Sequence, residues 1–258
     1  MNGLPLTLQD YAASRDALLV RLVEDLKADR RIAAAWLEGS FGRNEADQVS
    51  DLDLHLAIED ACAEALCFHP RSRNAGTAPE RLALISTFGR PALIHENHHN
   101  APPGGSFSFV LYSTSAVMVD WILAPLAAAA RPPESRLLFE KKPIPIRAIE
   151  LPQAEEPPSQ DVAERMAFFW MMAAVCCKYI ARGEDETVAW FYTVLQNTLV
   201  ETDRLVHPDS SRSDKNPRPV LPETLLELCR QMNGLAQEAH QAPAPLDEIN
   251  TLLNLDHF

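Results

Sequence analysis

The chain contains 258 residues, and its 36 acidic against 23 basic residues give a formal net charge of −13. With 47% hydrophobic and 23% charged residues, the composition is that of a folded globular protein and excludes an intrinsically disordered chain. The negative field repels phosphate backbones and anionic lipids, which argues against a nucleic-acid or membrane-surface partner.

The first part of the chain predicts a helix followed by two strands. Thr7 can cap a helix that ends near Lys27, because the apolar residues between them recur at helical spacing. Residues 32–38 (IAAAWLE) predict a short buried strand. In residues 52–58, apolar and polar side chains alternate, which predicts a second strand with one polar face.

A further helix and three strands are expected before residue 125. The stretch from Thr77 predicts the helix, and residues 92–95 predict a short strand. The segments 106–112 (SFSFVLY) and 116–124 (AVMVDWILA) predict an antiparallel hairpin. Asp120 lies within the second of these segments among apolar neighbours. A carboxylate in that position requires a structural or functional reason.

Proline marks the boundary between two parts of the chain. Eight of the 20 prolines lie between Pro125 and Pro158, which excludes a long helix there but leaves room for a short strand at LLFE. Beyond them, Ser159 or Asp161 can cap a helix that ends near Gly183. Further helices are expected at about 184–206, 222–240 and 246–256.

These elements predict an α+β fold with two domains. We expect a mixed-sheet domain in residues 1–125, a proline-rich connector in 126–158 and an α-helical bundle in 159–258.

The cysteines and the N-terminus suggest a reducing compartment. The five cysteines form no CxxC pair, so the sequence predicts neither a disulfide framework nor a thiolate zinc site. The first residues lack a basic segment followed by an apolar run, and no apolar stretch of about 18 residues occurs. A cytoplasmic protein is therefore expected.

The most informative segment joins the first two predicted strands. A Gly39-Ser40 turn follows the first strand, ten residues intervene, and the next strand brings Asp51 and Asp53. Residues i and i+2 of a strand point to the same face, so the two carboxylates should lie side by side. Such a pair suits Mg²⁺, which binds one or two carboxylates together with phosphate oxygens of a substrate.

The Gly-Ser turn can provide the phosphate site next to this metal. Glycine lets the backbone approach an anion closely, and the N–H groups with the Ser40 hydroxyl can hold a terminal phosphate. Arg43 is one of few nearby cations and is a further candidate for phosphate binding. Gly39, Ser40 and Arg43 are thus the candidate nucleotide-binding residues.

This Gly-Ser and Asp-x-Asp pattern resembles the nucleotidyltransferase superfamily that includes the polymerase β type. With the helical second part, the chain most resembles small bacterial transferases that adenylylate aminoglycosides or lincosamides. The resemblance rests mainly on residues 36–58, with support from 106–124. It implies a mixed sheet, two metal-bound aspartates and a third carboxylate on a later strand.

Asp120 matches the third carboxylate by its place in the hairpin. In that role it would ligate a metal and accept the proton of the acceptor hydroxyl as that hydroxyl attacks the α-phosphorus of a nucleotide. The resemblance thus implies two Mg²⁺ ions, held by Asp51, Asp53 and Asp120, and ATP or another nucleoside triphosphate as co-substrate. Glu96 is the alternative candidate for the base, because it also follows a short strand.

Other polar and aromatic clusters are interpreted as structural. His95, His98 and His99 fit no zinc-site spacing and are expected at the surface or in a loop. The Trp190-Phe191-Tyr192 run is expected to lie mostly in the core, because successive helical residues point in different directions. By resemblance, Glu201 is a candidate acceptor-binding acid.

The uneven distribution of charge along the chain indicates which kind of acceptor molecule is expected. Residues 1–150 carry 15 basic and 19 acidic residues, whereas residues 151–258 carry 8 and 17, so the shorter part has the larger net charge of −9. A negative cleft concentrates cations. The expected reaction is transfer of a nucleoside monophosphate, such as AMP, to a hydroxyl of a small and cationic molecule, with release of pyrophosphate. A homodimer is compatible with the resemblance.

Two other functions remain open. One is a toxin–antitoxin nucleotidyltransferase that adenylylates or binds a partner protein, although the fused helical part lacks the Arg-x₄₋₆-His spacing of the usual partner. The other is a polynucleotide-extending transferase, which needs a basic surface that the acidic second part does not offer.

Overall fold

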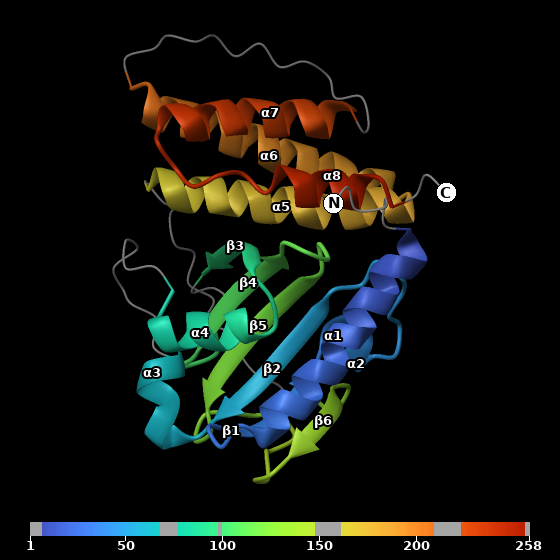
Figure 1. Ribbon diagram of the computed structural model, residues 1–258, viewed down its shortest axis with the longest axis vertical. Coiled ribbons are helices and arrows are strands. Elements are labelled where there is room, and N and C mark those ends of the chain that lie inside the picture. Colours follow the sequence, from blue (N-terminus) through green and yellow to red (C-terminus); the bar gives the residue numbers. More distant parts are fainter. Residues whose placement is uncertain (1–6, 68–76, 98–99, 148–160, 209–222, 256–258) are drawn as a thin grey trace. The chain divides into compact units, whose positions relative to one another are not determined.

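The computed structural model describes residues 7–67, 77–97, 100–147, 161–208 and 223–255 (Figure 1). They form the expected α+β fold, with an N-terminal six-stranded mixed sheet followed by a helical region. The described residues divide into two compact units, one formed by residues 8–147 and the other mainly by residues 161–208 and 223–255. None of the helices in these ranges combines the length and the apolar character that a membrane crossing requires.

The sheet contains one parallel pair of strands in its centre. Its order is β3-β4-β5-β2-β1-β6, and the parallel pair is β2 with β5, whereas the other neighbours are antiparallel. The strands are β1 (Ile32–Leu37), β2 (Leu52–Ile58), β3 (Pro91–Glu96), β4 (Ser106–Tyr112), β5 (Met118–Pro125) and β6 (Arg136–Glu140). The strands expected from the sequence, including the β4–β5 hairpin, are therefore confirmed.

Helices cover one face of this sheet (Figure 1). They are α1 (Leu8–Ala28), α3 (Ala63–Cys67) and α4 (Pro79–Thr87), and a 3₁₀ turn at Asp60–Cys62 precedes α3. On this face the ring of Trp121 in β5 lies 5.6 Å from that of Phe88, which ends α4. The Tyr112 hydroxyl donates a hydrogen bond to the Ile85 carbonyl of α4. Because side chains alternate along a strand, Asp120 points to the opposite face.

The opposite face is partly covered by the chain that follows β5. Trp36, Ala57 and Ala124 form an apolar cluster with Ala129 and Ile144 from this segment. The segment also contributes β6, which pairs with β1 at the edge of the sheet. Residues 126–147, expected as part of a connector, therefore complete the sheet and its core.

The described residues of the second unit form four helices, α5 (Val162–Arg182), α6 (Asp185–Val206), α7 (Glu223–Glu238) and α8 (Leu246–Leu253). Asp161 caps α5, since its carboxylate accepts hydrogen bonds from the backbone N–H groups of Ala163 and Glu164. Gly183 ends the helix with a φ of 67°, a left-handed conformation that favours glycine. The other candidate cap, Ser159, lies outside the described residues.

Candidate active site

The centre of the candidate site is a pair of aspartates on the two parallel strands. Asp53 of β2 and Asp120 of β5 are direct register partners. Residues opposite one another on neighbouring strands point to the same face, and the strands lie about 4.8 Å apart. Both side chains are half-buried. The fold thus brings together two carboxylates that are separated by 67 positions in the sequence.

Gly39 lies directly against one of these carboxylates. It begins α2 (Gly39–Gly42), a single helical turn after β1, and its φ of 57° is in the left-handed region. A Cβ atom at this position would lie 2.0 Å from Oδ2 of Asp53, a distance that no side chain can tolerate. In addition, the backbone N–H of Glu38 donates to the Asp53 carbonyl at 3.1 Å. Glycine is therefore required for the close approach of this turn to Asp53.

The same turn contains a buried hydroxyl. The Oγ atom of Ser40 is buried and has no hydrogen-bond partner among the described residues. A buried polar atom without a partner is costly, and such atoms are often satisfied by a ligand or an ordered water. The two other nucleotide-binding candidates, Gly39 and Arg43, are in the same turn or at its end.

Arg43 is exposed at the end of this turn. Its Nε atom forms an ion pair with Oε2 of Glu45 at 2.7 Å. This hydrogen bond raises the pKa of Arg43, and the negative charge of Asp53 contributes in the same direction. Arg43 thus lies within electrostatic reach of the aspartate pair, with its guanidinium currently bound to Glu45.

Asp51 lies at the entrance of β2. Strand pairing with β5 begins one residue later, at Leu52 with Val119. Asp51 is half-buried and lies just outside β2, so the strand alternation from which its position beside Asp53 was predicted does not fix its side chain. Within the described ranges, no three His, Cys, Asp or Glu side chains gather as a metal-binding cluster. Asp53 and Asp120 are thus in register, whereas the position of Asp51 depends on the turn that precedes it.

The group formed by Trp36, Glu38 and His55, close to Asp53, was not predicted from the sequence. His55 stacks on Trp36, with ring centroids 5.4 Å apart. Glu38 Oε1 accepts a hydrogen bond from Trp36 Nε1 at 2.9 Å and lies 3.3 Å from Nδ1 of His55. Burial lowers the pKa of His55 to about 3 and raises that of Glu38. The alternation of β2 already placed His55 on the face of Asp53, but nothing in the sequence pointed to Glu38.

Glu96, the alternative base, is engaged elsewhere. Its carboxylate accepts two hydrogen bonds from Arg81, at 2.8 and 2.9 Å, and one from the Ser108 hydroxyl at 2.7 Å. Glu96 is opposite Ser108, which is opposite Trp121, so Glu96 lies on the helix-covered face. The structure therefore does not bring Glu96 to Asp120.

The expectation that His95 lies at the surface is wrong. It is in β3 and only 8% exposed, and burial lowers its pKa to about 4. His98 and His99 lie outside the described residues.

In the helical unit, Glu201 is half exposed and forms an ion pair with the buried Arg165. Phe191 and Tyr192 are buried as expected, whereas Trp190 is 57% exposed.

Comparison with models of known protein families and with curated proteins finds no match for this chain. Two in-register carboxylates, a further one at the strand entrance and a glycine turn packed against Asp53 combine hard oxygen ligands with backbone N–H groups. Such a combination can hold a divalent cation beside a phosphate group.

Proposed function

We propose that this protein is a Mg²⁺-dependent nucleotidyltransferase that transfers a nucleoside monophosphate, AMP from ATP in the first instance, to a hydroxyl of a small molecule. The observation that carries the proposal is the register of Asp53 with Asp120, together with the packing of Gly39 against Asp53. The nucleotidyltransferase resemblance of residues 36–58 supports the same chemistry.

The residues present suit magnesium as the metal. Asp51, Asp53 and Asp120 offer only carboxylate oxygens, which hard cations such as Mg²⁺ prefer over softer metals. Carboxylates placed this close together repel one another, and a cation between them relieves that repulsion. When bound there, Mg²⁺ would neutralise the charge of the triphosphate and stabilise the negative charge of the transition state.

The protein's own groups then bind and orient the nucleotide and accept a proton from the acceptor. The backbone N–H groups of the Gly39 turn and the Ser40 hydroxyl hold a phosphate group. Arg43 exchanges Glu45 for a phosphate oxygen. Asp120 accepts the proton of the acceptor hydroxyl, whose oxygen forms a bond to the α-phosphorus while the bond to pyrophosphate breaks. The products are the nucleotidylated acceptor and pyrophosphate.

The acceptor we propose is cationic, of the kind represented by aminoglycosides or lincosamides. Residues 151–258 carry 17 acidic against 8 basic residues. A surface of one sign raises the local concentration of oppositely charged ligands. Glu201 is a candidate contact in this unit, although its ion pair with Arg165 would have to open or be shared for it to bind an ammonium group.

The test is release of pyrophosphate from each nucleoside triphosphate with Mg²⁺ and a panel of aminoglycosides and lincosamides. We expect release with at least one acceptor, and a loss of at least about 100-fold in kcat for Asp53→Asn and Asp120→Asn, because these carboxylates act on the reacting groups. Asp25→Asn, an exposed change on α1, is the matched control and should leave the rate unchanged.

The outcomes separate this proposal from its alternatives. Full activity of the Asp53 and Asp120 variants would contradict the assigned chemistry. If no small molecule supports release but a stoichiometric partner protein becomes nucleotidylated, the protein is of the toxin–antitoxin type.

A further inference from the structure

Arg15 of α1 is a buried cation in the unit that contains the candidate site. It is only 5% exposed. Its Nε and Nη2 atoms donate to Oδ1 of Asp16 at 3.0 and 2.9 Å, and Asp16 itself is largely exposed. A buried guanidinium is tolerated only where its donors are satisfied. The remaining hydrogen bonds of Arg15 therefore identify the segment that its buried guanidinium contacts.

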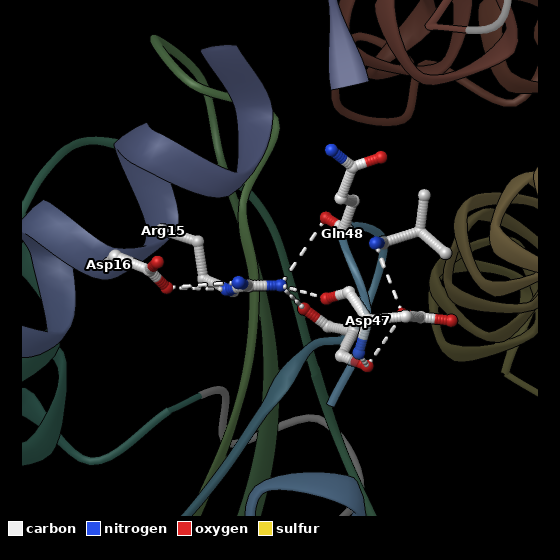
Figure 2. Close-up of polar contacts among 6 residues, drawn as sticks. Arg15, Asp16, Asp47 and Gln48 are labelled. Carbon is white, nitrogen blue, oxygen red and sulfur yellow. Dashed lines mark hydrogen bonds and ion pairs between the residues drawn. The ribbon is translucent and has the colours of Figure 1, made fainter. Parts of the chain in front are cut away.

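Those contacts are with the turn that leads into β2 (Figure 2). Nη1 of Arg15 donates to the backbone carbonyls of Asp47 at 2.7 Å, Gln48 at 3.3 Å and Ser50 at 3.0 Å. Three carbonyl oxygens that converge on one point repel each other unless a cation is at their focus. The guanidinium thus fixes the direction of three peptide groups at once, 32 to 35 positions away in the sequence.

The turn is also closed by its own side chains. Oδ1 of Asp47 accepts hydrogen bonds from the Ser50 hydroxyl at 2.7 Å and the Val49 backbone N–H at 3.2 Å. The backbone N–H of Asp47 donates to the Ser50 hydroxyl oxygen at 2.9 Å. These bonds set the local shape of the turn, whereas Arg15 attaches the turn to α1.

The residue that follows this turn is Asp51. Ser50 is fully buried, and its carbonyl, held by Arg15, belongs to the peptide bond that continues into Asp51. Asp51 precedes the first strand pair, Leu52 with Val119, so the sheet ladder does not fix its backbone. Asp53 differs, because it is paired within the ladder and its carbonyl accepts from Glu38.

Arg15 also contacts the glycine turn. Its Cζ atom lies 4.8 Å from the ring centroid of Phe41, which is in α2 together with Gly39 and Ser40. A guanidinium over an aromatic face is attracted by the ring. One side chain of α1 therefore contacts both the turn that precedes Asp51 and the turn that contains Gly39 and Ser40.

We propose that Arg15 is a positioning residue that sets the orientation of Asp51, and with it the affinity of the site for a divalent cation. The inference rests on the proposed function. It assigns to α1, which provides none of the candidate ligands, control over the orientation of the Asp51 carboxylate. Arg15 does so through the carbonyl of Ser50, without touching the substrate.

The test measures binding of Mn²⁺, as a spectroscopic probe, in the presence of a non-hydrolysable ATP analogue. Replacing a group that orients a metal ligand costs about 10- to 100-fold in metal affinity, and we expect a loss of about 10-fold for Arg15→Met. Arg15→Lys should recover part of it, because an ammonium group can still reach one or two of the carbonyls. The matched control is Arg21→Met, because exposed Arg21 on the same helix donates only a long bond of 3.4 Å to the Thr87 carbonyl.

A double-mutant cycle separates positioning from general stability. In the Asp51→Asn background, Arg15→Met should cause no further loss of Mn²⁺ affinity, since its effect passes through Asp51. Unchanged Mn²⁺ affinity in Arg15→Met, or an equal loss with and without Asp51, would overturn the inference. Amide exchange at residues 47–51 adds a readout independent of the metal, and it should be faster in Arg15→Met and Arg15→Lys than in Arg21→Met.

Failure of the inference can be distinguished from failure of the proposed function. If the wild-type protein binds Mn²⁺, Asp53→Asn abolishes binding and both Arg15 variants retain it, only the role of Arg15 is refuted. If the wild-type protein binds neither Mn²⁺ nor the nucleotide analogue, both are refuted.

Discussion

At the scale of single residues, Gly39 is a position where the structure leaves no room for a side chain. A Cβ atom there would lie 2.0 Å from the Asp53 carboxylate, and the backbone has a φ of 57°. Gly39→Ala must therefore displace the turn or the carboxylate, and it also costs about 1–2 kcal/mol for the left-handed conformation. A displacement of about 1 Å at a reacting centre can reduce the rate by about 100-fold. We expect a loss of that size in kcat/KM with a modest fall in melting temperature.

Gly234 offers a matched control for this substitution. It lies within α7, and a Cβ atom there meets nothing within 4 Å. Gly234→Ala should raise the free energy of unfolding by about 0.5–1 kcal/mol, because alanine is the better helix former. It should leave kcat/KM unchanged. Retained activity in Gly39→Ala would show that the turn does not need to approach Asp53.

At the scale of elements, the Arg81–Glu96 pair joins α4 to β3. Arg81 is fully buried and also donates to the Leu66 carbonyl of α3 at 2.6 Å. Removing one member of a buried ion pair typically costs about 3–5 kcal/mol. We expect Glu96→Gln to lower the free energy of unfolding by roughly this amount, measured by denaturant titration. The kcat of the folded fraction should be retained, because Glu96 lies on the face opposite to Asp120.

The double variant Arg81→Met/Glu96→Gln tests the energetic coupling between Arg81 and Glu96. It should be less destabilised than the two single changes together, since neither partner then leaves a buried charge. A large loss of kcat in Glu96→Gln without loss of stability would instead return Glu96 to the list of candidate bases.

The same elements show what the sequence could predict. Periodicity, caps and glycines are local signals, and they predicted the strands, the helices α1, α4 and α5 to α8, and the cap Asp161 of α5, but not the short helices α2 and α3. The parallel pairing of β2 with β5 and the place of β6 beside β1 depend on contacts between distant segments, which periodicity does not encode. For the same reason, strand geometry predicted Asp51 and Asp53 on one face, but β2 begins only at Leu52, and the register of Asp53 with Asp120 could not be predicted.

Residues that act through distant partners were missed altogether. Arg15 belongs to an ordinary helical pattern, and its carbonyl partners follow 32 to 35 positions later. Glu38 lies at the end of a buried strand, and only the fold brings it to His55. Conversely, His95 reads as part of a polar loop, although β3 buries it beside β4.

At the scale of the whole molecule, the proposed function assigns nucleotide and acceptor binding to two parts of the chain that differ in net charge. The N-terminal part, with a net charge of −4, carries the candidate nucleotide site, whereas residues 151–258 carry −9. If the second part attracts a cationic acceptor, its acids should contribute to acceptor binding without affecting the nucleotide. Long-range attraction of this kind weakens with salt, because the Debye length falls from about 10 Å at 0.1 M to about 3 Å at 1 M.

Neutralising acids of α6 tests this division, with Asp185 and Glu186 exposed and Glu201 half exposed. The triple variant Asp185→Asn/Glu186→Gln/Glu201→Gln should raise KM for a cationic acceptor several-fold while KM for the nucleotide and kcat stay within about twofold, since the acids act on the free acceptor rather than on the reaction. The matched control neutralises three acids of α1, Asp10→Asn/Glu24→Gln/Asp25→Asn, and should leave acceptor KM unchanged. The KM difference between wild type and the α6 variant should shrink as salt rises. An equal KM change in the two triple variants would mean that net charge alone matters, whereas no change in either would place the acceptor away from these acids.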